Sequence, residues 1–294
     1  MSEAISYFDL GATLYTPCTH GKLSSLLQDN TFSARSMVLC LEDSVREDEL
    51  ELALNNLKLS LQDFQPDRNV KRFIRPRNPL VLAEILNYNN IDKIDGFVLP
   101  KFDLHTIDLY EKVINEQEHS SFSYMPILET AQVFDKSAMI QLRQRLKHWK
   151  SHISCLRIGG NDLMNLLGIK RMKGMTTYDT PLRSVLDQLI IIFRTEGFEL
   201  SAPVFDMLDD LETLKKEVNM DLAYGFYAKT AIYPAHIDVI EQAFSQFTQR
   251  YSLQADSVLD ENASAVFKLN GQMMEQTCHK SWALRTQQLS KRYN

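Results

Sequence analysis

The chain has 294 residues, of which 44% are hydrophobic, and it carries a formal net charge of −6. This length suits one large domain or two small ones with a sizeable core, and the acidic balance excludes the basic surface that nucleic-acid binding requires. The sequence contains no leader-like start and no apolar run of 18 residues, so we expect neither secretion nor membrane insertion. Its four cysteines are expected to be reduced thiols in a cytoplasmic protein.

Short apolar runs alternate with longer amphipathic stretches along most of the chain. In order, the runs cover 12–17, 36–43, 72–76, 95–101, 123–130, 153–160, 198–205 and 230–236, and a weaker candidate at 220–226 competes with the last. Helical patterns between them include 47–61, 79–88 and 180–197. Continuous apolar runs are typical of strands buried on both faces, and their alternation with helices indicates a parallel sheet of βαβ units.

Roughly eight such units predict an α/β fold, a (β/α)₈ TIM barrel, over residues 1–250. An open doubly wound sheet is the alternative, but the chain lacks a GxGxxG turn after its first strand. Beyond residue 250 the alternation stops. We expect residues 251–294 to form a C-terminal helical lid, or an arm that joins subunits.

The C-terminal strand ends of such a barrel carry its catalytic groups. The residues at these ends are Glu42, Asp43, Arg75, Lys101, Glu129, Gly160, Asn161 and Asp162. Glu129 and Asp162 follow adjacent strands, so their carboxylates are expected to converge. Two carboxylates and several waters suit Mg²⁺, whereas a zinc site would require His or Cys. Backbone N–H groups of Gly160 and Asn161 can approach an anionic ligand closely.

Each of these residues also has a structural interpretation. An acid at a strand end is commonly the N-cap of the next helix, which is one interpretation of Asp162 alone. Arg75 alone is explained by a structural ion pair, and Lys101 is expected to be exposed rather than catalytic. The combination of Glu129, Asp162 and Arg75 favours a functional site.

Seven short motifs, in order along the chain, resemble those of the citrate lyase β-subunit-like family in the HpcH/HpaI aldolase superfamily of carbon–carbon lyases. They are LYTP (14–17), LCLEDSV (39–45), FIRPR (73–77), DGFVLPK (95–101), PILETA (126–131), GGNDL (159–163) and AIYPAH (231–236). The chain departs from the family pattern at residues 11–13, at Cys18 and at Tyr233. These positions lie at the expected mouth. They indicate a divergent branch, similar to lyase-like proteins encoded beside tellurium-resistance or stress genes.

The resemblance implies a TIM barrel that binds Mg²⁺ through Glu129 and Asp162. Arg75 is then expected to face the substrate's carbonyl or enolate oxygen, while Glu42 and Asp43 hold waters or orient their neighbours. Proteins of this family cleave or form a bond between an acetyl-type CoA thioester and a small 2-oxo acid through an enolate.

The family often carries its general base in a C-terminal stretch, Gly-x-Met-Ile/Val-Asp-x-Pro. The corresponding stretch is GQMMEQTCH (271–279), with Glu275 at the position of the Asp. The resemblance therefore implies Glu275 as a catalytic base. It also implies a homo-oligomer, a trimer or hexamer, because the base often comes from another subunit.

Two other functions remain open from the sequence. One is a Mg²⁺-dependent 2-oxo acid aldolase that needs no CoA, which the changed mouth favours. The other is a non-catalytic barrel protein of a stress-related operon. For all three we expect no nucleic-acid or membrane partner.

Overall fold

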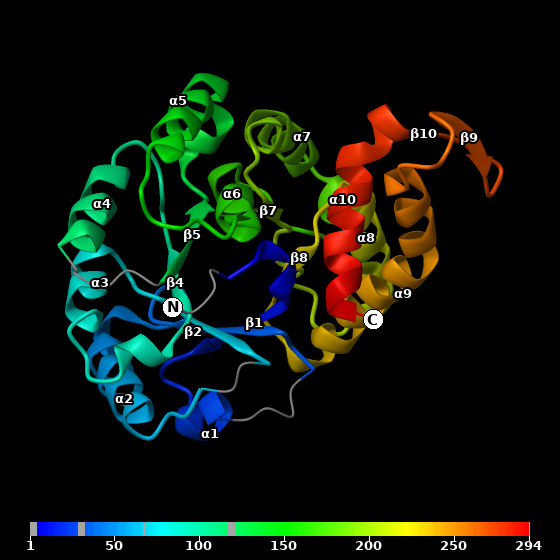
Figure 1. Cartoon of the computed structure of the whole chain (residues 1–294). Helices are drawn as coiled ribbons and strands as arrows, with labels where there is room; N and C mark the ends of the chain where they lie inside the picture. The colour runs from blue at the N-terminus through cyan, green and yellow to red at the C-terminus, as the bar shows by residue number, and fades with distance from the viewer. Residues whose placement is uncertain (1–4, 29–32, 67–68, 117–121, 294) are drawn as a thin grey trace.

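Eight parallel strands form the centre of the molecule in a computed structural model that describes residues 5–28, 33–66, 69–116 and 122–293. The strands are β1 Gly11–Pro17, β2 Ser36–Cys40, β3 Lys71–Arg75, β4 Gly96–Leu99, β5 Ser123–Leu128, β6 Leu156–Ile158, β7 Leu200–Ser201 and β8 Ala228–Ala231. Their order is β7-β6-β5-β4-β3-β2-β1-β8. The sheet closes where Ala202, just after β7, pairs with Lys229 of β8. This closure confirms the expected TIM-barrel fold (Figure 1).

Helices cover the outside of the barrel (Figure 1). They are α1 Leu23–Gln28, α2 Leu50–Gln62, α3 Pro79–Ile85, α4 Ile107–Asn115, α5 Lys136–Lys147, α6 Gly160–Leu166, α7 Leu182–Phe193 and α8 Leu211–Ala223. The local sequence determines where several helices begin. Asn78 caps α3, whose first residue is a proline, while Asp135 caps α5 and Asp210 caps α8. Every residue of β2 and β5 is buried, as expected for strands covered on both faces.

Most strands are shorter than the predicted apolar runs, and the differences at β8 and β2 bear on the site. β8 occupies Ala228–Ala231 rather than 230–236, because Pro234 opens the next helix and its fixed φ favours a helix start. The competing run 220–226 lies largely in the last turn of α8. β2 ends at Cys40 rather than at residue 43, so Glu42 and Asp43 lie in the loop that follows.

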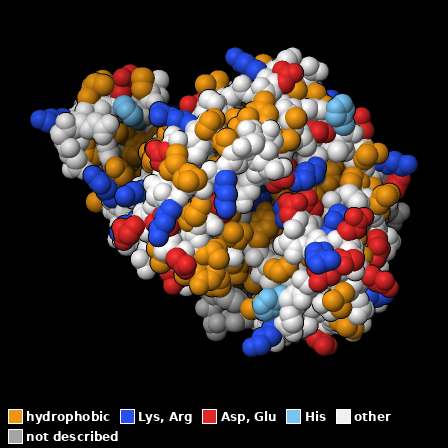
Figure 2. Space-filling view, turned by 180° about the vertical axis from the view of Figure 1, so that it is seen from behind, with side chains coloured by type: hydrophobic (Ala, Val, Ile, Leu, Met, Phe, Trp, Pro, Cys, Tyr) orange, Lys and Arg blue, Asp and Glu red, His pale blue; other side chains and the backbone are white. Residues whose placement is uncertain are grey.

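The C-terminal segment begins with a long helix, α9 Pro234–Leu259, which spans residue 250. A hairpin of β9 Val266–Leu269 and β10 Gln272–Glu275 follows, and α10 Gln276–Tyr293 returns alongside α9. A small separate core joins these elements through Ala255, Val258, Met274 and Ala283. The hairpin stands out from the body at the right of Figure 1 and the upper left of Figure 2.

Helix α9 runs from one end of the barrel to the other. It begins just after β8, and further along it Glu241 accepts a hydrogen bond from the N–H of Ala12, at the start of β1. Phe247 then packs on Tyr227, the residue before β8. The hairpin therefore lies beyond the N-terminal ends of the strands. In the described part of the chain, no helix is both long and apolar enough to cross a membrane.

Candidate active site

Three carboxylates converge at the C-terminal ends of the strands. Asp43, Glu129 and Asp162 each offer one oxygen within 4.8 Å of the others. Asp43 lies in the loop after β2, Glu129 follows β5, and Asp162 lies in the first turn of α6. Gly159 makes room for this approach, because a Cβ there would lie 2.4 Å from the Cβ of Glu129. The structure thus brings together the two predicted metal ligands and adds Asp43.

Arg75 faces this cluster from the end of β3. Its Nη1 lies 3.1 Å from Oε2 of Glu42 and 3.6 Å from Oδ2 of Asp43. Its Nε and Nη2 donate to Sγ of Cys40 at 3.2 and 3.0 Å, and its guanidinium carbon lies 5.2 Å from the centroid of the Tyr15 ring. These contacts hold a buried guanidinium in one orientation beside the acids.

Lys101 lies closer to the cluster than the sequence suggested. Its side chain is 40% exposed, but its Nζ pairs with Asp162 and lies 3.5 Å from both Glu42 and Glu129 and 3.7 Å from Asp43. A left-handed backbone, with φ at 49°, turns the chain here, and the Lys101 N–H donates to Oε1 of Glu129 at 2.7 Å. The side chain is partly exposed, as expected, but it lies within the cluster, which the sequence did not indicate. Its ammonium group partly neutralises the acids.

The environment perturbs the acids in different directions. Burial raises the pKa of the Glu129 carboxyl to about 8, although Lys101 and Arg75 oppose the rise. Burial also raises the pKa of Glu42. Burial acts in the same sense on Asp43, but a hydrogen bond with Glu42 and the charges of Arg75 and Lys101 outweigh it and lower the pKa of Asp43. A cluster of partly desolvated oxygen donors of this kind fits a hydrated divalent cation such as Mg²⁺.

Asp43, Glu129 and Asp162 line a cavity of about 570 Å³ that opens at this face. Gly160 and Asn161, predicted to bind an anion through their N–H groups, also line it. Gly160 opens α6 and packs tightly, since a Cβ there would lie 2.9 Å from Cβ of Pro203. The cavity thus combines acids, a fixed guanidinium from Arg75 and a helix start.

Glu275 is not part of this cavity. It ends β10, in the hairpin beyond the N-terminal ends of the strands, and its backbone N–H donates to Nδ1 of His279 at 3.1 Å. Within one chain, the structure does not bring Glu275 together with Glu129 or Asp162.

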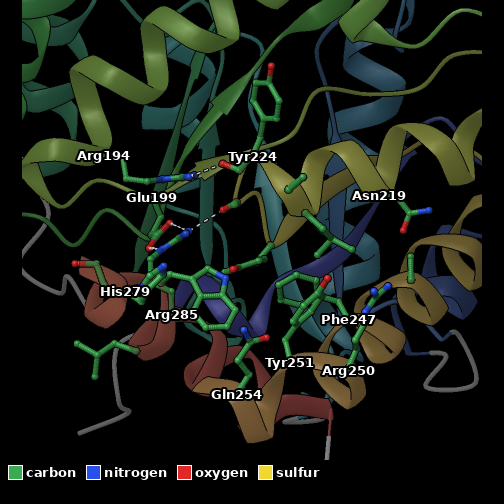
Figure 3. Close-up of a pocket in the computed structure, with 18 of the residues that line it drawn as sticks. Arg194, Glu199, Asn219, Tyr224, Phe247, Arg250, Tyr251, Gln254, His279 and Arg285 are labelled. Carbon is green, nitrogen blue, oxygen red and sulfur yellow. Dashed lines mark hydrogen bonds and ion pairs between the residues drawn. The ribbon is translucent and has the colours of Figure 1, made fainter. Parts of the chain in front are cut away.

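A larger cavity, about 1140 Å³, lies between α8, α9 and α10 near the other end of the barrel (Figure 3). Arg285 of α10 donates to both carboxylate oxygens of Glu199 at 2.8 and 2.6 Å, and Arg194 donates to the carbonyl oxygen of Tyr224 at 2.7 Å. Glu199 is the one acid among the lining residues described, and it is already paired. This cavity lacks the acid cluster, so the smaller one is the candidate active site.

Residues 4–294 match the family described as C-C bond lyase of the TIM-barrel fold. The chain belongs to this family. The match confirms the class of enzyme, a carbon–carbon lyase, and the resemblance to citrate lyase β-like proteins that the seven motifs indicated.

Solved structures share the lyase's fold at low sequence identity. CitE from Mycobacterium tuberculosis in complex with magnesium, acetoacetate and coenzyme A is 18% identical, with 96% of this chain and 97% of that chain covered and a TM-score of 0.67. RipC from Yersinia pestis is 19% identical, with 81% of this chain and 96% of that chain covered and a TM-score of 0.61. The citrate lyase β subunit from M. tuberculosis complexed with oxaloacetate and magnesium is 17% identical, with 81% of this chain and 99% of that chain covered and a TM-score of 0.59. A comparison with curated protein sequences found no significant match.

Sequence reasoning gave no role to Cys40 or Arg157 and did not place Lys101 among the acids. Cys40 was an unremarked residue of an apolar run, and Lys101 was expected to be exposed rather than catalytic. Arg157, which lines the cavity, carries a charge in the middle of the apolar run CLRIGG. A charge within a buried strand is the signal that would have singled it out.

Proposed function

We propose that the lyase depends on Mg²⁺ and cleaves or forms a bond between an acetyl-type CoA thioester and a small 2-oxo acid through an enolate. The observation that carries the proposal is the convergence of Asp43, Glu129 and Asp162 beside Arg75, at the face where barrels of this type hold their active sites. Family membership supports the reaction class, and the donor set supports the metal.

Glu129 and Asp162 would hold the Mg²⁺, with Asp43 as a third oxygen donor or a partner for its waters. When bound, the ion would supply Lewis acidity at the carbonyl group of the 2-oxo acid. Lys101 now occupies the centre of the cluster, so its ammonium group has to move aside when a cation enters.

The chain's own groups then bind and orient the substrate. Arg75 is a fixed cation, aligned by Cys40 and Glu42, that offsets negative charge on the enolate oxygen. The N–H groups of Gly160 and Asn161, at the start of α6 and beside the cavity, would receive the carboxylate of the 2-oxo acid. The Arg75 interaction strengthens as negative charge develops on the enolate oxygen, whereas binding of the carboxylate orients the substrate throughout the reaction.

The general base in this proposal is Glu275 of another copy of the chain. Glu275 lies beyond the far end of its own barrel, so only a neighbouring subunit's hairpin could bring this side chain to the carboxylate cluster. The active form is therefore a homo-oligomer. Mixing tests this directly: Glu129→Gln and Glu275→Gln variants are each expected to be inactive, and hybrid oligomers are expected to regain activity. If hybrids containing both variants stay inactive, Glu275 does not act across subunits.

Formation of a 3-hydroxyacyl-CoA adduct tests the reaction itself. The protein is incubated with acetyl-CoA and oxaloacetate, pyruvate or glyoxylate, with Mg²⁺ or with EDTA, and the CoA thioesters are separated and identified by mass. We expect Mg²⁺-dependent formation of the adduct that Glu129→Gln abolishes and that Glu212→Gln, an exposed acid at the start of α8, leaves unchanged. If no thioester reacts with any 2-oxo acid, this proposal is wrong.

A CoA-independent aldolase is the second candidate, and the mouth of the cavity favours it. Pro17 lines that mouth, and the family's usual small residue after this proline is replaced by Cys18, which is buried. Tyr233, at the family's histidine position, is 38% exposed. Mg²⁺-dependent release of pyruvate from a hydroxy-oxo acid, without any thioester, would support this candidate over the first.

A further inference from the structure

Arg157 lies on the inner side of the barrel, below the carboxylate cluster. It is the middle residue of β6 and is 2% exposed. Its Nη2 donates to Oγ1 of Thr230 at 2.9 Å and its Nη1 to Sδ of Met125 at 3.5 Å. Its guanidinium carbon lies 5.5 Å from the centroid of the Tyr15 ring. Arg157 and Thr230 line the same cavity as the acids, so this guanidinium borders the candidate active site.

Arg157 is a buried cation without a carboxylate partner among the residues that the structure describes. It makes no ion pair there, and its buried Nε has no hydrogen-bond acceptor. Two other fully buried cations, Lys229 and Arg171, are both paired with Glu217. Burying an unpaired charge is costly, so chains normally supply a counter-ion or receive one from a ligand. The chain neutralises these two cations with its own acids, whereas the described residues supply no carboxylate to Arg157.

The two guanidiniums of the cavity lie close to the same aromatic ring. Those of Arg75 and Arg157 lie 5.2 and 5.5 Å from the centroid of Tyr15. Arg75 is next to Glu42 and the metal-binding acids, whereas Arg157 contacts only a hydroxyl, a thioether and the ring. The cavity is therefore bordered by one guanidinium that is already paired with acids and by a second that has no carboxylate partner among the described residues.

We propose that Arg157 determines specificity by binding a second anionic group of the substrate, so that the preferred 2-oxo acid is a dianion with a further carboxylate. This inference rests on the function proposed above. An arginine binds a carboxylate through charge-assisted hydrogen bonds, and the buried surroundings strengthen them. A 2-oxo acid that carries a single carboxylate leaves Arg157 unpaired and binds more weakly.

Oxaloacetate and pyruvate form a matched pair of probes, since oxaloacetate is pyruvate with one more carboxylate. The dissociation constant of each is measured by calorimetry in the presence and absence of Mg²⁺, with wild type and with Arg157→Gln, Arg157→Lys and Arg183→Gln. Arg183 is an exposed arginine of α7 and serves as the control. We expect wild type to prefer oxaloacetate by about tenfold or more, the scale of one charge-assisted contact.

In Arg157→Gln the preference is expected to disappear while pyruvate binding changes less than about twofold. Arg157→Lys is expected to keep part of it, and Arg183→Gln all of it. Equal affinities of wild type for the two acids, or an equal loss of both in Arg157→Gln, overturns the inference about Arg157 and leaves the proposed function intact. If wild type binds neither acid in a Mg²⁺-dependent way, the proposed function fails as well. Should Arg157→Gln not fold, wild type and Arg157→Lys decide the question.

Discussion

Adding one methyl group at Gly159 should displace the metal-binding carboxylate without changing any acid. Gly159 precedes α6 with φ at −83°, which alanine adopts freely. A Cβ there would lie 2.4 Å from Cβ of Glu129 and 2.5 Å from its Oε2, where ordinary contacts start at 3.4 Å. Glu129 or the end of β6 must therefore move by roughly 1 Å, a displacement large enough to disrupt a site that depends on close geometry.

We expect Gly159→Ala to weaken Mg²⁺ binding at least tenfold, equivalent to about 1.4 kcal/mol. Overpacking of this kind is expected to lower the free energy of unfolding by about 1–3 kcal/mol, so the variant should still fold. Calorimetric Mg²⁺ titration and thermal unfolding measure the two effects. Gly21→Ala is the matched control, because nothing lies within 4 Å of a Cβ at Gly21. Unchanged Mg²⁺ affinity in Gly159→Ala would refute the place of Glu129 in the metal site.

Three further substitutions test other parts of the account. Lys101→Met removes the ammonium group that competes with a cation for the acids, so a Mg²⁺ titration should show several-fold tighter binding. Weaker Mg²⁺ binding would contradict this competition and mean that the lysine helps to hold the acids in place. Lys229→Met leaves the buried carboxylate of Asp221 without its cation and takes one of two cations from Glu217, so it should lower the free energy of unfolding in urea by about 3–5 kcal/mol. Lys147→Met removes a half-exposed ion pair and should lower it far less; equal losses would contradict this. Cys40→Ala removes the acceptor of two N–H groups of Arg75, so 2-oxo acid binding should weaken several-fold while the Mg²⁺ affinity stays constant. If the 2-oxo acid and Mg²⁺ both bind as in wild type, Cys40 does not orient Arg75 for substrate.

The fold and the meeting of the acids follow from the sequence for one physical reason. Buried parallel strands show as continuous apolar runs, and a barrel brings all their C-terminal ends to one face. Once the strand ends are located, Glu129 and Asp162 must approach each other, although 33 positions separate them. Errors of a few residues at those ends, as at β2 and β8, do not change this outcome.

The directions of several side chains could not be predicted from the sequence. A continuous apolar run does not reveal which residues face the interior, so the charge within the run marks Arg157 as unusual but does not place its side chain in the cavity. Lys101 points into the cluster because its backbone is left-handed, which its local sequence did not indicate. The position of Glu275 depends on how α10 packs on α9 and on the ion pair of Arg285 with Glu199, a contact between segments far apart in the chain.

Anomalous diffraction from crystals grown with Mn²⁺, used in place of Mg²⁺, tests the central claim most directly. The account predicts one strong anomalous peak per chain, bound by carboxylate oxygens of Glu129 and Asp162, and no peak at that place in Glu129→Gln crystals. A peak bound elsewhere, or none between these two acids at saturating Mn²⁺, would contradict it.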